Sequence, residues 1–178
     1  MAFDKTGTLT EGKPKLTSVV TAEGVTEEKL LETAASAEAL SSHPLAKAVL
    51  DGVEDRDIEF DEADEMEAIH GKGIRATDGD HVIQIGNLAM FDGEIPDDLE
   101  EKMDELHAAG ETTMAVQLDD EFLGVIAVAD TLREEADDMI KKIKEMGVEK
   151  TMLLTGDNAR VAKAIGDHPE HFSNLYIN

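Results

Sequence analysis

The chain has 178 residues, which is enough for one large domain or two small ones with a genuine hydrophobic core. Its 41 acidic residues outnumber its 16 basic ones, and a net charge of −25 without any basic cluster argues against nucleic-acid binding. The sequence has no cysteine for disulfides or thiolate metal sites, and no apolar run approaches the roughly 20 residues that span a bilayer.

The first 40 residues alternate between strand and helix patterns. The apolar run 1–3 predicts a short strand that ends at Asp4, and the carboxyl end of a parallel strand is where α/β proteins place their chemistry. Pro14 is expected to break the pattern before a second strand over 16–21. Apolar positions at helical spacing then predict a helix over 26–40.

The middle of the chain indicates two helices and a hairpin. Pro44 favours a helix start, because its missing N–H would have no partner in the first turn. Residues 73–85 predict a β-hairpin with Asp78-Gly79 as its turn. Apolar positions from 95 to 106 mark another helix, which is expected to stop at Gly110.

The last third changes its pattern. Two β runs, 112–118 and 122–129, precede a helical stripe over 136–146 and a short buried strand over 151–154. A strand–helix–strand order with a functional turn after the strand is Rossmann-like. We therefore expect an α/β fold in which a Rossmann-like domain, residues 1–15 and 130–178, carries an inserted α+β domain over 16–129 with an antiparallel sheet and helices.

The segment Asp4-Lys5-Thr6-Gly7-Thr8-Leu9-Thr10 is the most informative in the chain. A carboxylate nucleophile needs donors and a metal ion to bring a phosphate to it, and Lys5 with the threonine-rich turn can help supply them. An ordinary strand and turn is the alternative interpretation. As a motif, the segment resembles the phosphorylation signature of P-type ATPases, ion pumps of the haloacid-dehalogenase superfamily that form an aspartyl-phosphate.

Further motifs follow in the order of that family, and the resemblance covers residues 1–166. Residues 42–46, Ser-His-Pro-Leu-Ala, resemble the nucleotide-domain signature of the heavy-metal-transporting subgroup, whose glycine motifs fall at 71–73 and 86–87. Residues 130–133, Asp-Thr-Leu-Arg, resemble the hinge motif that leads back to the phosphorylation domain. Residues 155–158, Thr-Gly-Asp-Asn, are similar to the second phosphate-site motif.

The resemblance implies a role for each residue of the phosphorylation site. Asp4 would attack the γ-phosphoryl group of ATP, and Asp4 with the backbone carbonyl of Thr6 would bind Mg²⁺ beside it. Thr155 would donate its hydroxyl to the transferred phosphoryl group, in the same turn as Asp157. Asp130 would lie at the hinge that lets the inserted domain carry ATP to Asp4.

The resemblance also implies a nucleotide site in the insertion. Glu38 would accept a hydrogen bond from the adenine edge and His43 would line the adenine pocket. Gly71 and Gly73, with Gly86 in the next glycine motif, would let backbone approach the nucleotide closely. Taken alone, a histidine before a helix-starting proline is more often an N-cap than a ligand, and a lone Gly-x-Gly is usually a turn.

The chain departs from the family pattern after residue 158. Complete members continue to a lysine that neutralises the phosphoryl group and to a Gly-Asp-Gly-x-Asn-Asp motif whose aspartate binds Mg²⁺, and neither motif is present. We therefore expect a fragment of a pump, a monomer whose partners are ATP or ADP and the membrane helices and actuator domain of the full protein. Its own turnover is expected to be very weak or absent.

Two alternatives remain open at this point. A stand-alone phosphatase of the haloacid-dehalogenase type shares the Asp4 chemistry. Such enzymes usually have an aspartate as general acid two positions after the nucleophile. Here that position is Thr6, and threonine cannot protonate a leaving group. An inactive nucleotide-binding remnant is the non-catalytic alternative. For the transported ion, the sequence faintly favours zinc, cadmium or cobalt over copper. His168 and His171 have the spacing of a metal site but no nearby partner, so they are interpreted as surface residues.

The distribution of charge suggests a source and a location. Acidic residues coat the whole length of the chain, as on proteins of salt-accumulating halophiles, although a mesophilic acidic domain has the same composition. The absence of cysteine and of apolar spans fits a cytoplasmic portion of a membrane transporter.

Overall fold

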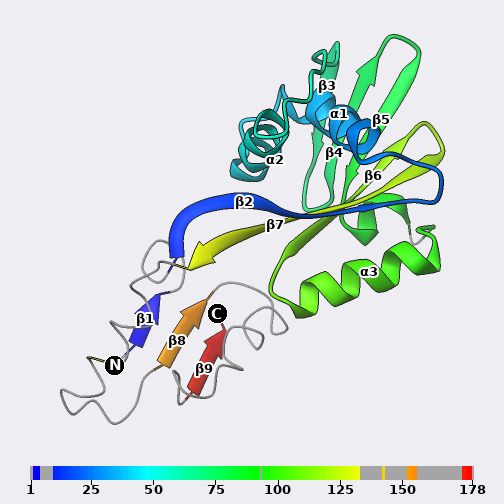
Figure 1. Ribbon diagram of the computed structural model, residues 1–178. Helices are drawn as coiled ribbons and strands as arrows, with labels where there is room; N and C mark the ends of the chain where they lie inside the picture. Colours follow the sequence, from blue (N-terminus) through cyan, green and yellow to red (C-terminus); the bar gives the residue numbers. More distant parts are fainter. Residues whose placement is uncertain are drawn as a thin grey trace.

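The computed structural model describes residues 2–4, 10–92, 94–132, 142, 152–155 and 174–177. The described strands form two sheets (Figure 1). A six-stranded antiparallel sheet has the order β2-β7-β6-β5-β4-β3, and a three-stranded parallel sheet has the order β1-β8-β9. The predicted α/β class with an inserted antiparallel sheet and helices is confirmed.

The large sheet contains the predicted hairpin and both later β runs. Its strands are β2 (Thr10–Thr21), β3 (Glu65–Ile69), β4 (Gly73–Asp78), β5 (His81–Gly86), β6 (Thr112–Leu118) and β7 (Glu121–Leu132). In the hairpin Asp78 pairs with His81, so the turn residues are Gly79 and Asp80, one position later than predicted. Gly79 has φ +57°, a left-handed conformation that suits glycine.

The break predicted at Pro14 is wrong, because β2 runs through it. The strand lies at the edge of the sheet and pairs only with β7 among the described strands. Proline is tolerated on an edge strand, where its missing N–H removes no ladder hydrogen bond. The pairing shifts register between Thr10 and Pro14, and this irregularity accommodates Gly12 at φ +69°.

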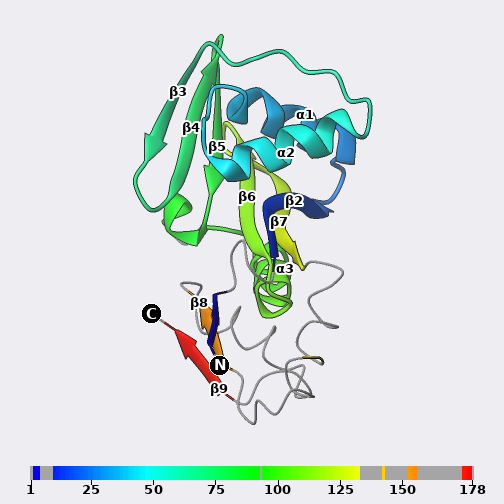
Figure 2. The ribbon, with the colours of Figure 1, turned by 90° about the vertical axis from the view of Figure 1, so that its left-hand side faces the viewer.

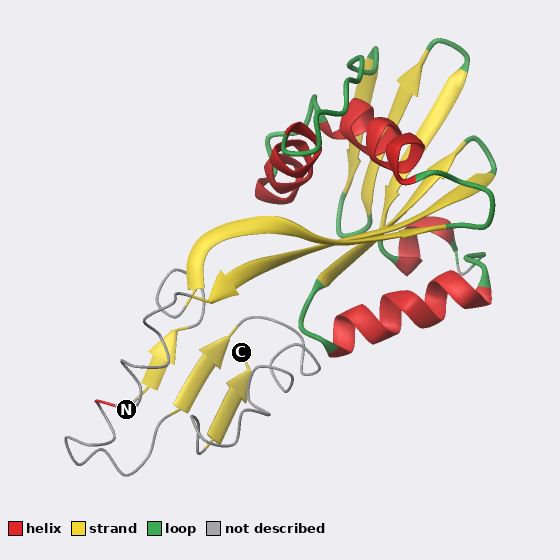
Figure 3. Cartoon of the chain, in the orientation of Figure 1, coloured by secondary structure: helices red, strands yellow, loops and turns green. Residues whose placement is uncertain are grey.

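In the described part of the chain, three α-helices flank the sheet (Figure 3): α1 (Glu27–Glu38), α2 (Pro44–Glu54) and α3 (Asp97–Ala108). Helix α1 begins where the sequence predicted, because the Thr26 hydroxyl accepts a hydrogen bond from the Lys29 amide. Helix α2 begins with Pro44 in its first turn. Helix α3 starts two residues after Ile95, where the helical pattern begins, and it stops just before Gly110 as predicted, with Gly110 at φ +89°.

The helices lie against the two faces of the sheet (Figure 2). Their side chains and those of the sheet form two hydrophobic clusters. Helices α1 and α2 pack on one face, where Leu30, Val49 and Ile126 are fully buried. Helix α3 packs on the other, where Met103 and Val125 are buried. The adjacent residues Val125 and Ile126 serve opposite clusters because side chains alternate along a strand.

The small sheet is parallel and brings together segments far apart in sequence. It consists of β1 (Ala2–Asp4), β8 (Met152–Thr155) and β9 (Asn174–Ile177). The strands predicted at 1–4 and 151–154 are confirmed, whereas β9 was not predicted. The helix predicted over 136–146 lies outside the described residues except for residue 142, and no described helix has the length and apolarity of a transmembrane span.

Candidate functional site: a nucleotide-sized pocket

A pocket of about 440 Å³ lies where four segments of the inserted domain meet. These segments are the end of α1 with the start of α2, the turn between β3 and β4, the end of β5 and the start of β6. The volume falls within the range of small-molecule sites, about 300–1,000 Å³. All five predicted nucleotide-binding residues line it: Glu38, His43, Gly71, Gly73 and Gly86.

Glu38 is the most unusual residue of the pocket. It is the last residue of α1 and only 4% exposed, and among the described side chains it is the one buried residue that can carry a charge. No hydrogen bond or ion pair to its carboxyl group comes from the part of the chain that the structure describes. Burial raises the pKa of the Glu38 carboxyl to about 7.

His43 both caps a helix and lines the pocket. Its Nδ1 accepts a hydrogen bond from the Leu45 amide at 3.2 Å, and its own amide donates to the Ser41 hydroxyl at 3.2 Å. Because Nδ1 is an acceptor, the neutral ring carries its proton on Nε2, which remains available to a ligand. The capping interpretation of His43 is therefore confirmed without excluding a ligand role.

Two of the glycines face each other across neighbouring strands. Gly73 pairs with Gly86 in the β4–β5 ladder. A Cβ on Gly73 would lie 2.0 Å from the Ile85 carbonyl oxygen, and one on Gly86 would lie 2.3 Å from the Lys72 carbonyl oxygen. Both positions therefore require glycine for the close approach of the protein's own backbone, before any ligand is considered.

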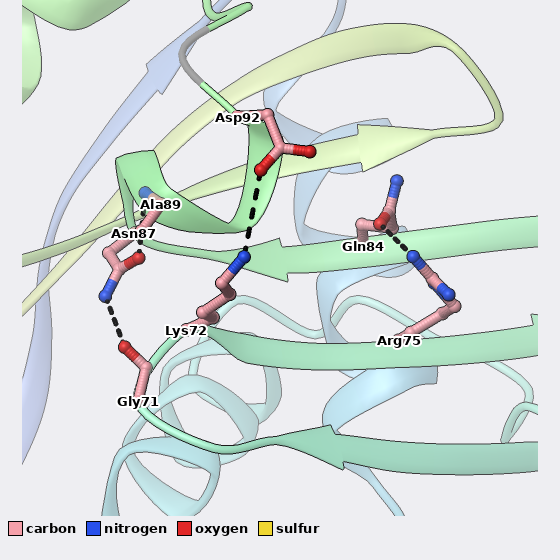
Figure 4. Close-up of polar contacts among 7 residues, drawn as sticks. All are labelled: Gly71, Lys72, Arg75, Gln84, Asn87, Ala89 and Asp92. Atoms are coloured by element: carbon pink, nitrogen blue, oxygen red, sulfur yellow. Dashed lines mark hydrogen bonds and ion pairs between the residues drawn. The ribbon is translucent and has the colours of Figure 1, made fainter.

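The turn that carries Gly71 and Lys72 is fixed from the adjacent strand end by Asn87 (Figure 4). The Asn87 amide group donates to the Gly71 carbonyl at 2.9 Å, and its backbone N–H donates to the Lys72 carbonyl at 2.9 Å. Its side-chain oxygen accepts from the Ala89 amide at 3.0 Å and caps the short 3₁₀ helix η2 (Leu88–Phe91). Asn87 was noticed in the sequence only as part of a motif, without a role.

Lys72 brings a cation to the pocket. It lies between Gly71 and Gly73, and its Nζ is 3.8 Å from the Asp92 carboxylate (Figure 4). Among the lining residues Lys72 is the one permanent cation, since the other basic groups there are His43 and His70. The sequence offered no signal for Lys72 beyond its position between two glycines.

The residues predicted for phosphorylation fall partly outside the described chain. Asp4 ends β1 and Thr155 ends β8, and these strands are parallel neighbours with Asp4 opposite Leu154. The backbone thus brings Asp4 and Thr155 to the same carboxyl-terminal edge of the small sheet. Thr6 and Asp157 lie outside the described residues, as do His168 and His171. No cluster of metal-ligating side chains occurs within the described part of the chain.

Asp130 lies where the large sheet leads toward the small one. Its carboxylate accepts a hydrogen bond from the Lys13 amide at 3.1 Å, which ties β7 to β2. These two strands form the long pair that reaches toward β1 (Figure 1). The position of Asp130 in this pair is compatible with the hinge role that the resemblance implied.

Comparison with known proteins gives consistent matches. The haloacid dehalogenase-like hydrolase family matches residues 1–178. A copper-exporting P-type ATPase of Bacillus subtilis (strain 168) is 39% identical over 167 residues, which are 93% of this chain but 21% of that protein. The chain therefore spans about one fifth of the length of this relative.

Solved structures agree with the sequence matches. A zinc-transporting PIB-type ATPase in its E2.Pi state superposes with a TM-score of 0.81 at 38% identity, over 97% of this chain and 28% of that one. The catalytic domain of the CPx-ATPase CopB-B, studied for its conformational changes upon nucleotide binding, gives a TM-score of 0.70 at 27% identity, over 99% of this chain and 61% of that one. The chain therefore belongs to the haloacid dehalogenase-like hydrolases, and the relatives that it matches over nearly its whole length are P-type ATPases of heavy-metal transport.

Proposed function

We propose that this chain is the ATP-binding and phosphorylation portion of a cation-exporting heavy-metal P-type ATPase. The observation that carries the proposal is the pocket, where five residues chosen from the sequence for nucleotide binding come together. They are separated by up to 48 positions in sequence, so their meeting is a property of the fold. The match to a CPx-ATPase catalytic domain studied for nucleotide binding supports the same conclusion.

The pocket offers different chemistry at its two ends. The α1–α2 end provides a buried carboxyl group at Glu38 and the ring of His43, which suit a base with hydrogen-bonding edges. The β3–β4 turn provides Gly71, Gly73 and the ammonium group of Lys72, which suit the phosphates. We infer that adenine occupies the first end and the phosphates lie along the second.

The small sheet would supply the phosphorylation chemistry. Asp4 and Thr155 end adjacent parallel strands, which is where a nucleophile and a phosphate-binding hydroxyl need to meet. Asp4 with the carbonyl of Thr6 would hold Mg²⁺, and the motif of Asp157 would complete the phosphate site. When bound, Mg²⁺ neutralises phosphate charge and orients the transferred group.

Other features of the full pump are part of the proposal. Residues 1–15 and 130–178 would belong to the phosphorylation domain and 16–129 to the nucleotide-binding domain, on the cytoplasmic side. The partners would be the actuator domain and membrane helices of the full pump. The matched proteins include a copper exporter and a zinc transporter, so we retain the lean to zinc, cadmium or cobalt as a proposal that rests on sequence alone.

Calorimetric titration of ATP with Mg²⁺ into the 178-residue chain tests the nucleotide site. A His43→Ala variant would lose both the imidazole and the cap of α2, and loss of a cap costs about 1 kcal/mol of stability. His43→Asn separates the two roles, because asparagine is a good N-cap without a ring. We expect both variants to bind ATP more weakly than the wild type.

Thr26→Ala is the matched control, because it removes the cap of α1, which lies outside the pocket lining. It should lose stability but retain ATP affinity. Equal ATP affinity of the wild type and His43→Asn would remove His43 from the binding site. Absence of ATP binding by the folded wild type would refute the proposed function.

A further inference from the structure

The carboxyl group of Glu38 is placed where an ionised form has no stabilising partner. It is 4% exposed, and within the described chain no N–H or O–H group donates to it. As the last residue of α1, it also lies at the helix end where unpaired carbonyls create a partial negative charge. A buried carboxylate without donors is costly, so the group favours its neutral form.

The neighbouring elements do not supply a compensating charge. The titratable groups that share the pocket are His43 at the start of α2 and His70 and Lys72 in the β3–β4 turn. The residues of β5 and β6 that line the pocket do not titrate. Among the described residues, none of the sheet strands contributes a buried charged side chain. Lys72 is half-exposed and lies 3.8 Å from Asp92, so its charge is engaged there.

The protonation state of a carboxyl group determines which bases it can read. A neutral carboxyl group has one O–H donor and one carbonyl acceptor, whereas a carboxylate only accepts. Adenine presents a ring-nitrogen acceptor beside its amino donor, so it forms two hydrogen bonds with the acid but one with the carboxylate. Guanine forms two with either form, because O6 lies beside N1–H and N1–H lies beside the 2-amino group. Ionisation therefore removes one hydrogen bond from adenine and none from guanine.

We propose that Glu38 reads the base of a nucleotide as a neutral carboxylic acid, donating its O–H to a ring nitrogen of adenine and accepting a hydrogen bond from the neighbouring amino group. The inference rests on the proposed nucleotide-binding function and adds the protonation state that the base requires. Adenine binds with the proton on Glu38 and supplies the hydrogen-bond partners that this carboxyl group lacks within the described chain. Protonation of Glu38 thus raises the affinity of the pocket for adenine relative to guanine.

The ratio of ATP to GTP affinity measures this effect directly. Protonation of the phosphates acts on ATP and GTP alike, so it cancels in the ratio. We expect the ratio to be constant at low pH and to fall as the pH rises above about 7, by up to about tenfold per pH unit for one proton. Titrations at constant ionic strength from pH 5.5 to 8.5 cover the range.

Glu38→Gln is the matched control, because an amide donates and accepts in the same arrangement as the neutral acid but does not titrate. Folded Glu38→Gln should show an ATP-to-GTP ratio that stays flat from pH 5.5 to 8.5. A carbon-13 NMR titration of the Glu38 carboxyl group in the wild type gives a second readout: adenosine should move its titration midpoint upward.

The outcomes separate the inference from the function on which it rests. A ratio that stays flat in the wild type, a midpoint that adenosine leaves unchanged or lowers, or a ratio that falls with pH in folded Glu38→Gln as it does in the wild type would each overturn the inference while leaving nucleotide binding intact. If the wild type binds neither ATP, GTP nor adenosine at any pH, the proposed function itself fails.

Discussion

Gly73 and Gly86 oppose each other in the β4–β5 ladder with no space for a side chain on either. A methyl group would meet a backbone oxygen of Ile85 at 2.0 Å in the first case and one of Lys72 at 2.3 Å in the second. These clashes are with backbone atoms, so only a separation of the two strands could relieve them. The pairing of β4 with β5 therefore requires glycine at both positions. The family motif and the needs of the fold coincide at these residues.

We predict that Gly73→Ala and Gly86→Ala destabilise the chain strongly, by more than the roughly 1 kcal/mol of an ordinary strained glycine position. Gly71→Ala should cost only about that smaller amount, because its Cβ meets nothing within 4 Å and only its φ of +70° is unfavourable. Chemical denaturation of the three variants checks the order.

Gly79→Ala is the control for backbone strain alone, since Gly79 has φ +57° and open space but lies outside the pocket lining. It should match Gly71→Ala in stability. If Gly73→Ala is as stable as Gly79→Ala, the backbone approach at Gly73 does not constrain the fold.

Lys72 and Asp92 form an exposed pair whose cation borders the pocket. We predict that Lys72→Gln weakens ATP binding more than ADP binding and leaves adenosine binding unchanged, because the ammonium group interacts with phosphate charge. Asp92→Asn should strengthen ATP binding, since it frees Lys72 from a competing anion. Calorimetric titration measures all three ligands.

A double-mutant cycle of Lys72 and Asp92 separates the effect of this ion pair on ATP affinity from the effect of net charge. Asp92→Asn should improve ATP affinity little when Lys72 is already glutamine, because its effect acts through that side chain. Lys47→Gln removes a cation that pairs with Asp51 at 2.9 Å outside the pocket lining, and it serves as the control for net charge. Equal losses in Lys47→Gln and Lys72→Gln would show that only net charge matters.

Much of the fold could be predicted because its signals are local. The Thr26 cap, the start of α2 at Pro44 and strand β6 follow from residues that are adjacent in sequence. Strand β3 was missed because Glu65 and Glu67 give it the appearance of a charged loop. It is an edge strand, where exposed charges are common.

The residues of the candidate site could be predicted from the sequence, but their burial and hydrogen bonds could not. Motif spacing selected Glu38 and His43, yet the burial of Glu38 depends on how α1, α2 and the β3–β4 turn pack together. The Asn87 side chain donates a hydrogen bond to the carbonyl of Gly71, 16 positions earlier, and no local sequence pattern indicates this contact. Long-range packing decides both features, so sequence periodicity cannot report them.

Glu38 also makes stability depend on pH. Its pKa rises from 4.5 in the unfolded chain to about 7 on folding, so the folded state binds the proton more tightly. The stabilising effect of that proton is present below pH 4.5 and is lost as the pH rises through 7, an amount of about 3 kcal/mol in unfolding free energy. We predict that Glu38→Gln gains stability relative to the wild type between pH 5 and pH 8.

Urea denaturation of both proteins at several pH values gives this difference directly. Glu32→Gln is the matched control, because Glu32 lies on the same helix with a 45% exposed side chain and an ion pair to Lys29. Its stability difference from the wild type should vary little across this range. A constant difference between the wild type and Glu38→Gln would contradict the prediction.

The net charge of −25 should make stability depend on salt. Like charges repel one another in the compact state, and salt screens that repulsion over a Debye length of about 10 Å at 0.1 M and about 3 Å at 1 M. We predict that the melting temperature rises as KCl increases toward molar concentrations, as the halophile interpretation requires. A melting temperature that stays constant or falls would argue against that interpretation.

The last prediction concerns phosphoryl transfer by the chain of residues 1–178. Asp4 and Thr155 meet at one sheet edge, but the phosphate-neutralising lysine motif and the Gly-Asp-Gly-x-Asn-Asp motif are not in this sequence. Loss of one preorganised electrostatic contact typically lowers a rate by about 100- to 1,000-fold, and two such contacts are missing. We therefore expect no sustained ATP hydrolysis by this chain.

Phosphorylation and turnover are separable, which gives the prediction two readouts. With γ-labelled ATP we expect at most trace labelling, stable in acid and released by hydroxylamine as an acyl phosphate is, and absent from Asp4→Asn. Thr155→Ala should lower any labelling without abolishing it, because it removes one donor to the phosphoryl group rather than the nucleophile. Robust multiple-turnover hydrolysis by the wild-type chain would mean that some other group neutralises the phosphate. Labelling that persists in Asp4→Asn would place the nucleophile elsewhere.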